Sequence, residues 1–251
     1  MEDRLHLTIE DSIPPVIRAT GELDYENCEG LDSVIRSTFK KCDSSLHLAL
    51  DELDFVDSSG LRILVKAALD GQKMGCSLSI VSMTPYLDKM LSISGFKHLF
   101  MITDPPTTVQ APVSTAVETP EPYSFKLEAT KSACREARDN VYAFAEKMGF
   151  DILALDDIKL AIGEAISNAV RHGASDCDYI EVQCRDDSGR LIVTIKYPSK
   201  TFDPESIPIP NSETAAEGGM GIYFMKIVMD RVHYDFSDGS ATLTLEKQLP
   251  R

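Results

Sequence analysis

The chain of 251 residues is long enough for two domains, since one domain takes ~150 residues. Hydrophobic residues make up 43% and charged residues 26% of it, which excludes a wholly disordered or collagen-like chain. With 25 basic against 40 acidic residues, the formal net charge is −15, and such a surface repels nucleic-acid phosphates and anionic lipid. We therefore expect neither nucleic acid nor a membrane as a partner.

The cysteines and the first residues point to a location. Six cysteines, at positions 28, 42, 76, 134, 177 and 184, form no C-x-x-C pair, so we expect reduced thiols and no zinc site. No apolar run approaches the ~20 residues of a membrane span, and the first residues lack the order of a signal peptide. These patterns indicate a cytoplasmic protein.

Strands and helices alternate in the first hundred residues. Apolar alternation predicts strands near residues 5–9, 16–19, 46–50, 78–81 and 99–102. Helical spacing predicts helices over about 31–39 and 59–74, and a further helix begins after Pro85, where proline suits the first turn. This order favours an α/β domain with a mixed, partly parallel sheet flanked by helices.

A stretch rich in proline and threonine then interrupts the pattern. Proline cannot donate to a strand ladder and restricts the residue before it, so neither helix nor strand persists through residues 104–122. We interpret this stretch as a linker between a first domain, 1–103, and a second domain, 123–251.

The second half groups its helices apart from its strands. The pattern predicts strands near 123–127, 179–185, 190–197, 232–236 and 241–245, the last two joined by a turn at 237–239. It predicts helices over about 131–148, 156–172 and 220–229, with an irregular loop over 198–218. Such an order favours an α+β domain with helices on one face of a sheet.

A serine pair lies where a predicted strand meets a predicted helix, in the sequence L-D-F-V-D-S-S-G-L from Leu53 to Leu61. One interpretation is a helix cap, because Asp and Ser accept hydrogen bonds from the first free N–H groups. The other is a phosphate site, because these amides and the helix dipole favour negative charge. The two are compatible, and we expect Ser59 to be the cap.

Three motifs make the first domain resemble the STAS domain of bacterial anti-sigma factor antagonists: T-G-E-L-D at 20–24, D-S-S-G-L at 57–61 and S-G-F at 94–96. In that family a partner kinase phosphorylates the serine directly after the Asp. The resemblance therefore implies Ser58 as the phosphorylation site, with Ser59 as the second choice. The phosphate adds about −1.5 to −2 charge beside Asp57, so we expect the docking surface to change.

Two polar motifs mark the second domain. Glu164, Asn168 and His172 are spaced by four residues along one face of a predicted helix, apart from its apolar stripe. Glycines at 218, 219 and 221 open the next predicted helix, where bare amides suit a phosphate. Taken singly, the first motif is a solvated polar face and the second a Gly-rich helix start.

Together, in this order, the two motifs resemble the GHKL ATPase superfamily and, within it, the anti-sigma-factor serine kinases. The resemblance implies a two-layer α/β sandwich that uses ATP and Mg²⁺. It implies that Glu164 is the catalytic base that orients the attacking hydroxyl and that Asn168 ligates Mg²⁺. It implies that Gly219, Met220 and Gly221, together with Asn168, contact the nucleotide.

One segment departs from that superfamily's pattern. The family has D-x-G-x-G after the strand, whereas this chain has Tyr197-Pro198-Ser199-Lys200-Thr201, followed by Phe202-Asp203-Pro204. The carboxylate that reads adenine is thus replaced by Tyr197. Losing a buried hydrogen bond of this kind weakens ATP binding by about 1–3 kcal/mol if nothing substitutes.

We expect a partner-switching regulator that acts on a sigma factor or on other anti-sigma and antagonist proteins. Its kinase half would transfer the γ-phosphoryl group of ATP to serine. The alternative is a non-catalytic docking module with a degenerate nucleotide site. A tether of about 20 residues gives an effective concentration of order mM, so we also expect the two domains to dock on each other, within one chain or across a homodimer.

Overall fold

The computed structural model describes residues 4–41, 45–103, 120–173, 179–199 and 219–250. These residues form two compact units, 4–103 and 120–250. Of the predicted linker, residues 104–119 lie outside the described part, as do 200–218 of the predicted irregular loop.

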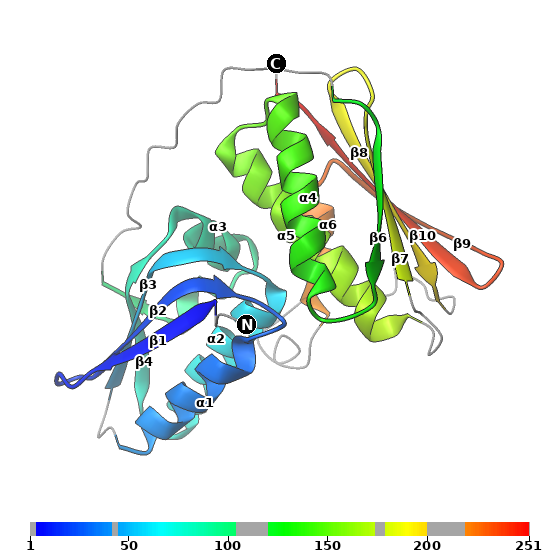
Figure 1. Ribbon diagram of the computed structural model, residues 1–251. Coiled ribbons are helices and arrows are strands. Elements are labelled where there is room, and N and C mark those ends of the chain that lie inside the picture. The colour runs from blue at the N-terminus through cyan, green and yellow to red at the C-terminus, as the bar shows by residue number, and fades with distance from the viewer. Residues whose placement is uncertain (1–3, 42–44, 104–119, 174–178, 200–218, 251) are drawn as a thin grey trace. The chain divides into compact units, whose positions relative to one another are not determined.

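Unit 1 is a mixed five-stranded sheet with helices packed on it (Figure 1). The strand order is β1-β2-β3-β4-β5; β1 pairs antiparallel with β2, and the other pairs are parallel. Its strands are β1 (Leu5–Glu10), β2 (Val16–Leu23), β3 (Ser45–Val56), β4 (Ser77–Met83) and β5 (Met101–Ile102). Its helices are α1 (Cys28–Phe39), α2 (Ser58–Lys73), α3 (Pro85–Ile93) and the 3₁₀ turn η1 (Lys97–Leu99). The predicted α/β class with a partly parallel sheet is confirmed.

Strand β3 is longer than the apolar run that predicts it. It continues to Val56 through an acidic segment, because Leu53 and Phe55 still alternate into the core. Across the sheet, Arg18 pairs with Asp51 at 3.6 Å and with Glu52 at 3.5 Å, which keeps those carboxylates compatible with a strand. The extension carries the chain directly to the first residue of α2.

The predicted last strand of unit 1, over 99–102, is wrong in extent. Only Met101 and Ile102 form β5, and residues 97–99 form the 3₁₀ turn η1. Gly95, with φ of +77°, ends the preceding turn, and the short polar run after Phe96 closes on itself through Leu99 N–H bonding to Phe96 O. Too few residues remain for a longer strand.

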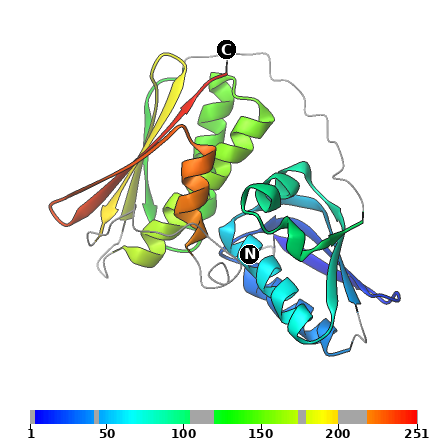
Figure 2. The ribbon, with the colours of Figure 1, turned by 180° about the vertical axis from the view of Figure 1, so that it is seen from behind.

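Unit 2 is a two-layer sandwich. Its antiparallel sheet has the order β6-β7-β8-β10-β9, and helices α4, α5 and α6 cover one face (Figures 1 and 2). The strands are β6 (Tyr123–Glu128), β7 (Tyr179–Asp186), β8 (Arg190–Pro198), β9 (Arg231–Ser237) and β10 (Ser240–Gln248). The helices are α4 (Ala133–Met148), α5 (Ile152–His172) and α6 (Met220–Val228). The predicted α+β class is confirmed.

The long helix α5 begins one turn earlier than its periodicity predicts, at Ile152 rather than at residue 156. Asp151 is the N-cap, and its side chain accepts a hydrogen bond of 2.8 Å from Ala154 N–H. Ile152 and Leu153 are 40% and 55% exposed, so they lie off the buried stripe that the sequence pattern detects. Helix α4, in contrast, begins later than predicted, at Ala133 rather than at residue 131.

The buried stripe of α5 agrees with the predicted one. Its members are fully buried between α4 and the sheet: Ile158, Ile162, Ala165, Ile166 and Ala169. None of the helices in the described part of the chain is long and apolar enough to span a membrane.

Candidate functional site

The start of α2 in unit 1 is organised by a single carboxylate. Asp57 is the N-cap, and its Oδ1 accepts hydrogen bonds from Ser59 N–H at 2.8 Å and Gly60 N–H at 2.9 Å. Its Oδ2 accepts a third, from Tyr25 N–H at 2.9 Å in the loop between β2 and α1. Asp57 therefore ties the start of α2 to that loop.

The expectation that Ser59 caps the helix is wrong. Asp57 has extended backbone angles and occupies the capping position, while Ser58 and Ser59 are already helical. The aspartate wins because its two oxygens reach three backbone donors, which one hydroxyl does not. Ser58 is 7% exposed and Ser59 is 2% exposed, so Ser58 is the more accessible of the two hydroxyls.

The surroundings of Ser58 are acidic. Burial, together with the charges of Asp57, Glu29 and Asp24, raises the pKa of the nearby Cys28 thiol to about 11. Arg62, one turn after Ser58 on α2, acts in the opposite direction. Three carboxylates and one guanidinium thus act on the first residue of α1.

In unit 2, helix α5 places Glu164 and Asn168 one turn apart. Glu164 is only 3% exposed, although the sequence pattern places it on a polar face. Asn168 is half-buried, and His172, in the last turn, is exposed. Partial desolvation of its ring and the neighbouring Arg171 lower the pKa of His172.

Helix α6 covers Glu164. Gly219 is its N-cap with φ of +88°, and Met220 is 1% exposed. A Cβ on Gly221 would collide with the Oε2 of Glu164 and come within 3.2 Å of its Cδ. The residue without a side chain is what lets the start of α6 approach the carboxylate. The structure thus brings Glu164 and Gly221 together, and Met220 directly precedes Gly221 in the chain.

Two tyrosines lie near Glu164: Tyr197 is 2% exposed and Tyr234 is half-buried. Burial raises the pKa of Tyr234, on β9, and the nearby Tyr197 and Glu164 raise it further. The neighbouring Asn168 side chain acts in the opposite direction. The Tyr234 hydroxyl therefore lies within reach of both predicted site residues of α5.

Tyr197 occupies the end of β8, where the resemblance expects a carboxylate. It is 2% exposed, and its cross-strand partner on β10 is Ala241, which is fully buried. A small residue opposite a large ring leaves space for that ring on the helix-covered face. Of the other departures, Ser199 is buried and pairs with Gly173, whereas Thr201 and Phe202-Asp203-Pro204 lie outside the described residues.

Sequence reasoning missed Tyr234 as a neighbour of the site. The alternation in β9 places Val232, Tyr234 and Phe236 on the helix-covered face. That signal was available, but the pairing of β10 with β8, which brings the β9–β10 hairpin to the site, depends on the sheet order. It also missed that Asp57 bridges to Tyr25, since their contact joins two distant segments.

The residues around Glu164 have the chemistry that a magnesium nucleotide requires. Mg²⁺ prefers hard oxygen ligands and keeps several waters, so a side-chain amide oxygen such as that of Asn168 is a suitable single ligand. Gly221 has no Cβ and lies at the start of a helix, so a phosphate can approach its backbone closely. These residues therefore fit ATP and Mg²⁺.

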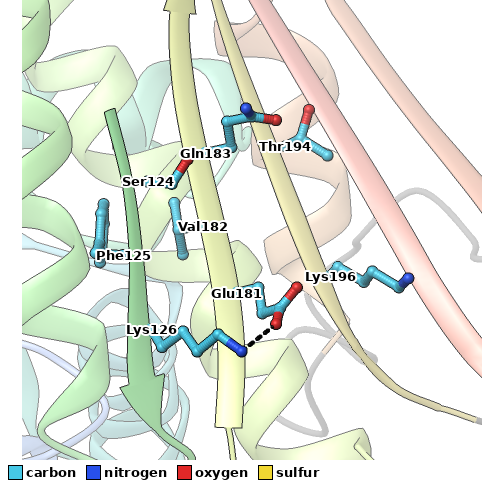
Figure 3. Close-up of a pocket in the computed structure, with 8 residues that line it drawn as sticks. All are labelled: Ser124, Phe125, Lys126, Glu181, Val182, Gln183, Thr194 and Lys196. Atoms are coloured by element: carbon cyan, nitrogen blue, oxygen red, sulfur yellow. Dashed lines mark ion pairs between the residues drawn. The ribbon is translucent and has the colours of Figure 1, made fainter. Parts of the chain in front are cut away.

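The sheet of unit 2 has a depression of about 350 Å³ on its other face (Figure 3). It is lined by side chains of β6, β7 and β8, and Lys126 and Glu181 form an ion pair of 2.6 Å across it. The hydrogen bond from Lys126 lowers the pKa of Glu181. None of the predicted site residues lines this depression, so it is separate from the site around Glu164.

Two family models match the chain. Residues 5–116 match the STAS domain, and residues 127–247 match the histidine kinase-like ATPase domain.

Curated relatives match up to about half of the chain. A serine-protein kinase RsbW of Bacillus licheniformis is 33% identical over 119 residues, which cover 43% of this chain and 73% of the relative. The RsbW of Bacillus velezensis is 29% identical over 135 residues, covering 50% and 84%. An anti-sigma factor antagonist of Mycobacterium paratuberculosis is a structural neighbour with 21% identity and a TM-score of 0.35, covering 41% of this chain and 87% of that one.

Proposed function

Because the chain belongs to the family of RsbW serine-protein kinases and carries a STAS domain ahead of its kinase half, we propose that it regulates a sigma factor by partner switching. Its kinase half binds a sigma factor or an antagonist protein, and the phosphorylation state of a STAS domain decides which partner is held. This account combines an antagonist and a kinase of that antagonist in one chain.

The proposed reaction is transfer of the γ-phosphoryl group of ATP to a serine hydroxyl. The serine oxygen forms a bond to the γ-phosphorus, and the bond from that phosphorus to the bridging oxygen of ADP breaks. Glu164 accepts the proton of the serine as general base. The observation that supports this most is the buried carboxylate of Glu164 against the bare backbone of Gly221, with Asn168 one turn away.

Asn168 is the residue proposed to hold Mg²⁺, through its amide oxygen, and Gly219, Met220 and Gly221 border the phosphates. Mg²⁺ supplies charge neutralisation on the triphosphate. Tyr234 lies beside Asn168. Of the Asn168 amide, only the oxygen can ligate a cation.

The proposed acceptor is Ser58 of the STAS domain. It follows Asp57 at the start of α2, where it is more accessible than Ser59. A phosphate there adds about −1.5 to −2 charge, which changes how the surface of unit 1 meets a partner.

A specific observation favours the second candidate, a non-catalytic docking module. Tyr197 is 2% exposed and fills the helix-covered face at the end of β8, where the resemblance expects an adenine-reading carboxylate. In this candidate the kinase fold binds partners without nucleotide.

Calorimetric titration of the full chain with ATP and Mg²⁺ separates the two. We expect binding that weakens at least about tenfold in Asn168→Ala, because the metal ligand is lost. Asn140→Ala is the matched control, since Asn140 lies on α4, and its side chain bonds Tyr123 and Glu136. An absence of ATP binding to the wild-type chain would establish the docking module instead.

A further inference from the structure

The hydrogen bonds at the start of α2 leave few free backbone N–H groups for a phosphate on Ser58. Asp57 already accepts the Ser59 and Gly60 amides, which are among the helix N-terminal donors that a phosphate ordinarily uses. Leu61 N–H is likewise used, by the Asp57 carbonyl at 2.9 Å. A phosphate at Ser58 must therefore either displace Asp57 or find another positive group.

The carboxylates nearby make a further negative charge costly. Asp24 and Asp57 are 2% and 3% exposed, and both act on the same Cys28 thiol as Glu29 does. Within this cluster the one basic group that acts on that thiol is Arg62. Like charges placed a few ångströms apart in a partly buried site repel strongly, so the phosphate needs that cation.

Arg62 is placed to provide it. It follows Ser58 by four residues on α2, a separation of about 6 Å along the axis and on the same helix face. Arg62 is half-buried, and no ion pair engages its guanidinium within the part of the chain that the structure describes. The next basic residue on this face, Lys66, is already held by Asp32 of α1 at 3.1 Å.

We propose that Arg62 is the counter-ion of phosphorylated Ser58, so that the phosphate folds back along α2 onto the guanidinium and leaves Asp57 in its cap. This inference rests on the proposed role of Ser58 as acceptor. An acidic group one turn before a basic one is the favourable order on a helix, and the guanidinium fork matches phosphate oxygens in pairs.

The pairing has a consequence for partner choice. Without the phosphate, unit 1 presents a hydroxyl and an uncommitted guanidinium one turn apart. With it, the hydroxyl is blocked and the guanidinium is neutralised, so one modification changes two recognition features. A partner that binds Arg62 through a carboxylate is released even if it never touches Ser58.

The test installs phosphoserine at position 58 during synthesis of the full chain, so that it does not depend on any kinase. The second pKa of the phosphate, about 6 when unpaired, is measured by ³¹P NMR titration. We expect that value to rise by at least about 0.3 units in Arg62→Gln relative to wild type, and to change less in Arg62→Lys. Lys73→Gln, at the far end of α2 with a side chain 78% exposed, is the control and leaves the value unchanged.

Amide hydrogen exchange on the same samples checks the cap. In the proposal, phosphorylation leaves Tyr25, Ser59 and Gly60 amides as protected as before. An identical phosphate pKa in wild type and Arg62→Gln, or faster exchange at those three amides on phosphorylation, would overturn it. Failure of Ser58 to be modified by the chain's own kinase half is read separately, by phosphopeptide mapping of the unmodified protein.

Discussion

Among single residues, Glu164 depends on a contact made far away in the chain. Its carboxylate is 3% exposed because the start of α6 lies over it, and this approach requires that residue 221 carry no Cβ. The position of Glu164, proposed as the base, therefore depends on Gly221, proposed to lie beside the phosphate.

The substitution Gly221→Ala tests the contact between Gly221 and Glu164. A methyl group collides with Glu164 Oε2, so the carboxylate or the start of α6 must move. We expect the free energy of unfolding of unit 2 to fall by about 1–3 kcal/mol and phosphotransfer to fall with it. Urea unfolding followed by circular dichroism measures the first, which suits a chain without tryptophan.

Gly30→Ala is the control for that change. Gly30 lies in α1 with no atom within 4 Å of the added Cβ, so we expect it to stabilise unit 1 by about 0.5–1 kcal/mol. Equal effects of the two substitutions would show that Gly221 is not in close contact with Glu164.

His172 gives the stability a pH dependence. Its pKa in the folded chain is lowered by partial desolvation and by Arg171, so the unfolded chain binds more protons just below pH 6.5. We therefore expect the free energy of unfolding to fall as the pH drops from 7.5 to 5.5, and to fall less in His172→Gln. Urea titrations at the two pH values measure it. The same fall in both proteins would assign it to other groups.

Among the elements, helix α2 depends most on its first residues. Asp57 satisfies three backbone donors, two in α2 and one in the loop before α1, whereas Asp151 at the start of α5 satisfies one. The difference follows from position: α2 begins where strand β3 ends, next to the end of β2.

Substitution of Asp57 and of Asp151 compares a cap that accepts three backbone hydrogen bonds with a cap that accepts one. We expect Asp57→Ala to cost about 2–3 kcal/mol of unfolding free energy and Asp151→Ala about 1 kcal/mol. Asp57→Asn keeps an oxygen for Ser59 and Gly60 but turns an N–H₂ group toward Tyr25 N–H. Hydrogen exchange should then quicken at Tyr25 alone. Faster exchange at all three amides in Asp57→Asn would contradict the assignment of the two oxygens.

Sequence periodicity predicted which segments form helices and strands, but it did not predict which of them pack against one another. The stripe on α5 follows from helical spacing, and the hairpin of β9 and β10 follows from alternation around Asp238-Gly239. The burial of Glu164 did not follow, because it depends on α6 packing across it. Tyr234 was missed for a similar reason: alternation fixes its face and the turn pairs β9 with β10, but neither predicts that β10 lies beside β8.

At the scale of the whole molecule, the proposed acceptor Ser58 and the proposed kinase site belong to two domains of one chain. If the domains can meet, the proposed tether of about 20 residues would give them an effective concentration of order mM. Docking of Ser58 near the helix that starts at Met220 would then compete with external partners. Added negative charge on an acidic protein would oppose that docking.

Small-angle scattering of the full chain tests this arrangement. We expect Ser58→Ala to give a compact profile and a sample with phosphoserine at 58 to give a more extended one, at matched ionic strength. Two identical, extended profiles would mean that the units never dock and that the fusion serves co-localisation.

The central claim is that this chain phosphorylates a STAS serine with Glu164 as base. Incubation of the full chain with ATP and Mg²⁺, followed by intact-mass analysis and phosphopeptide mapping, tests it directly. The account predicts one phosphate, on Ser58, and a rate at least about 100-fold lower in Glu164→Gln, which keeps the side-chain volume. Phosphate on Ser59 alone, an unchanged rate in Glu164→Gln, or no phosphate on a chain that binds ATP would contradict it.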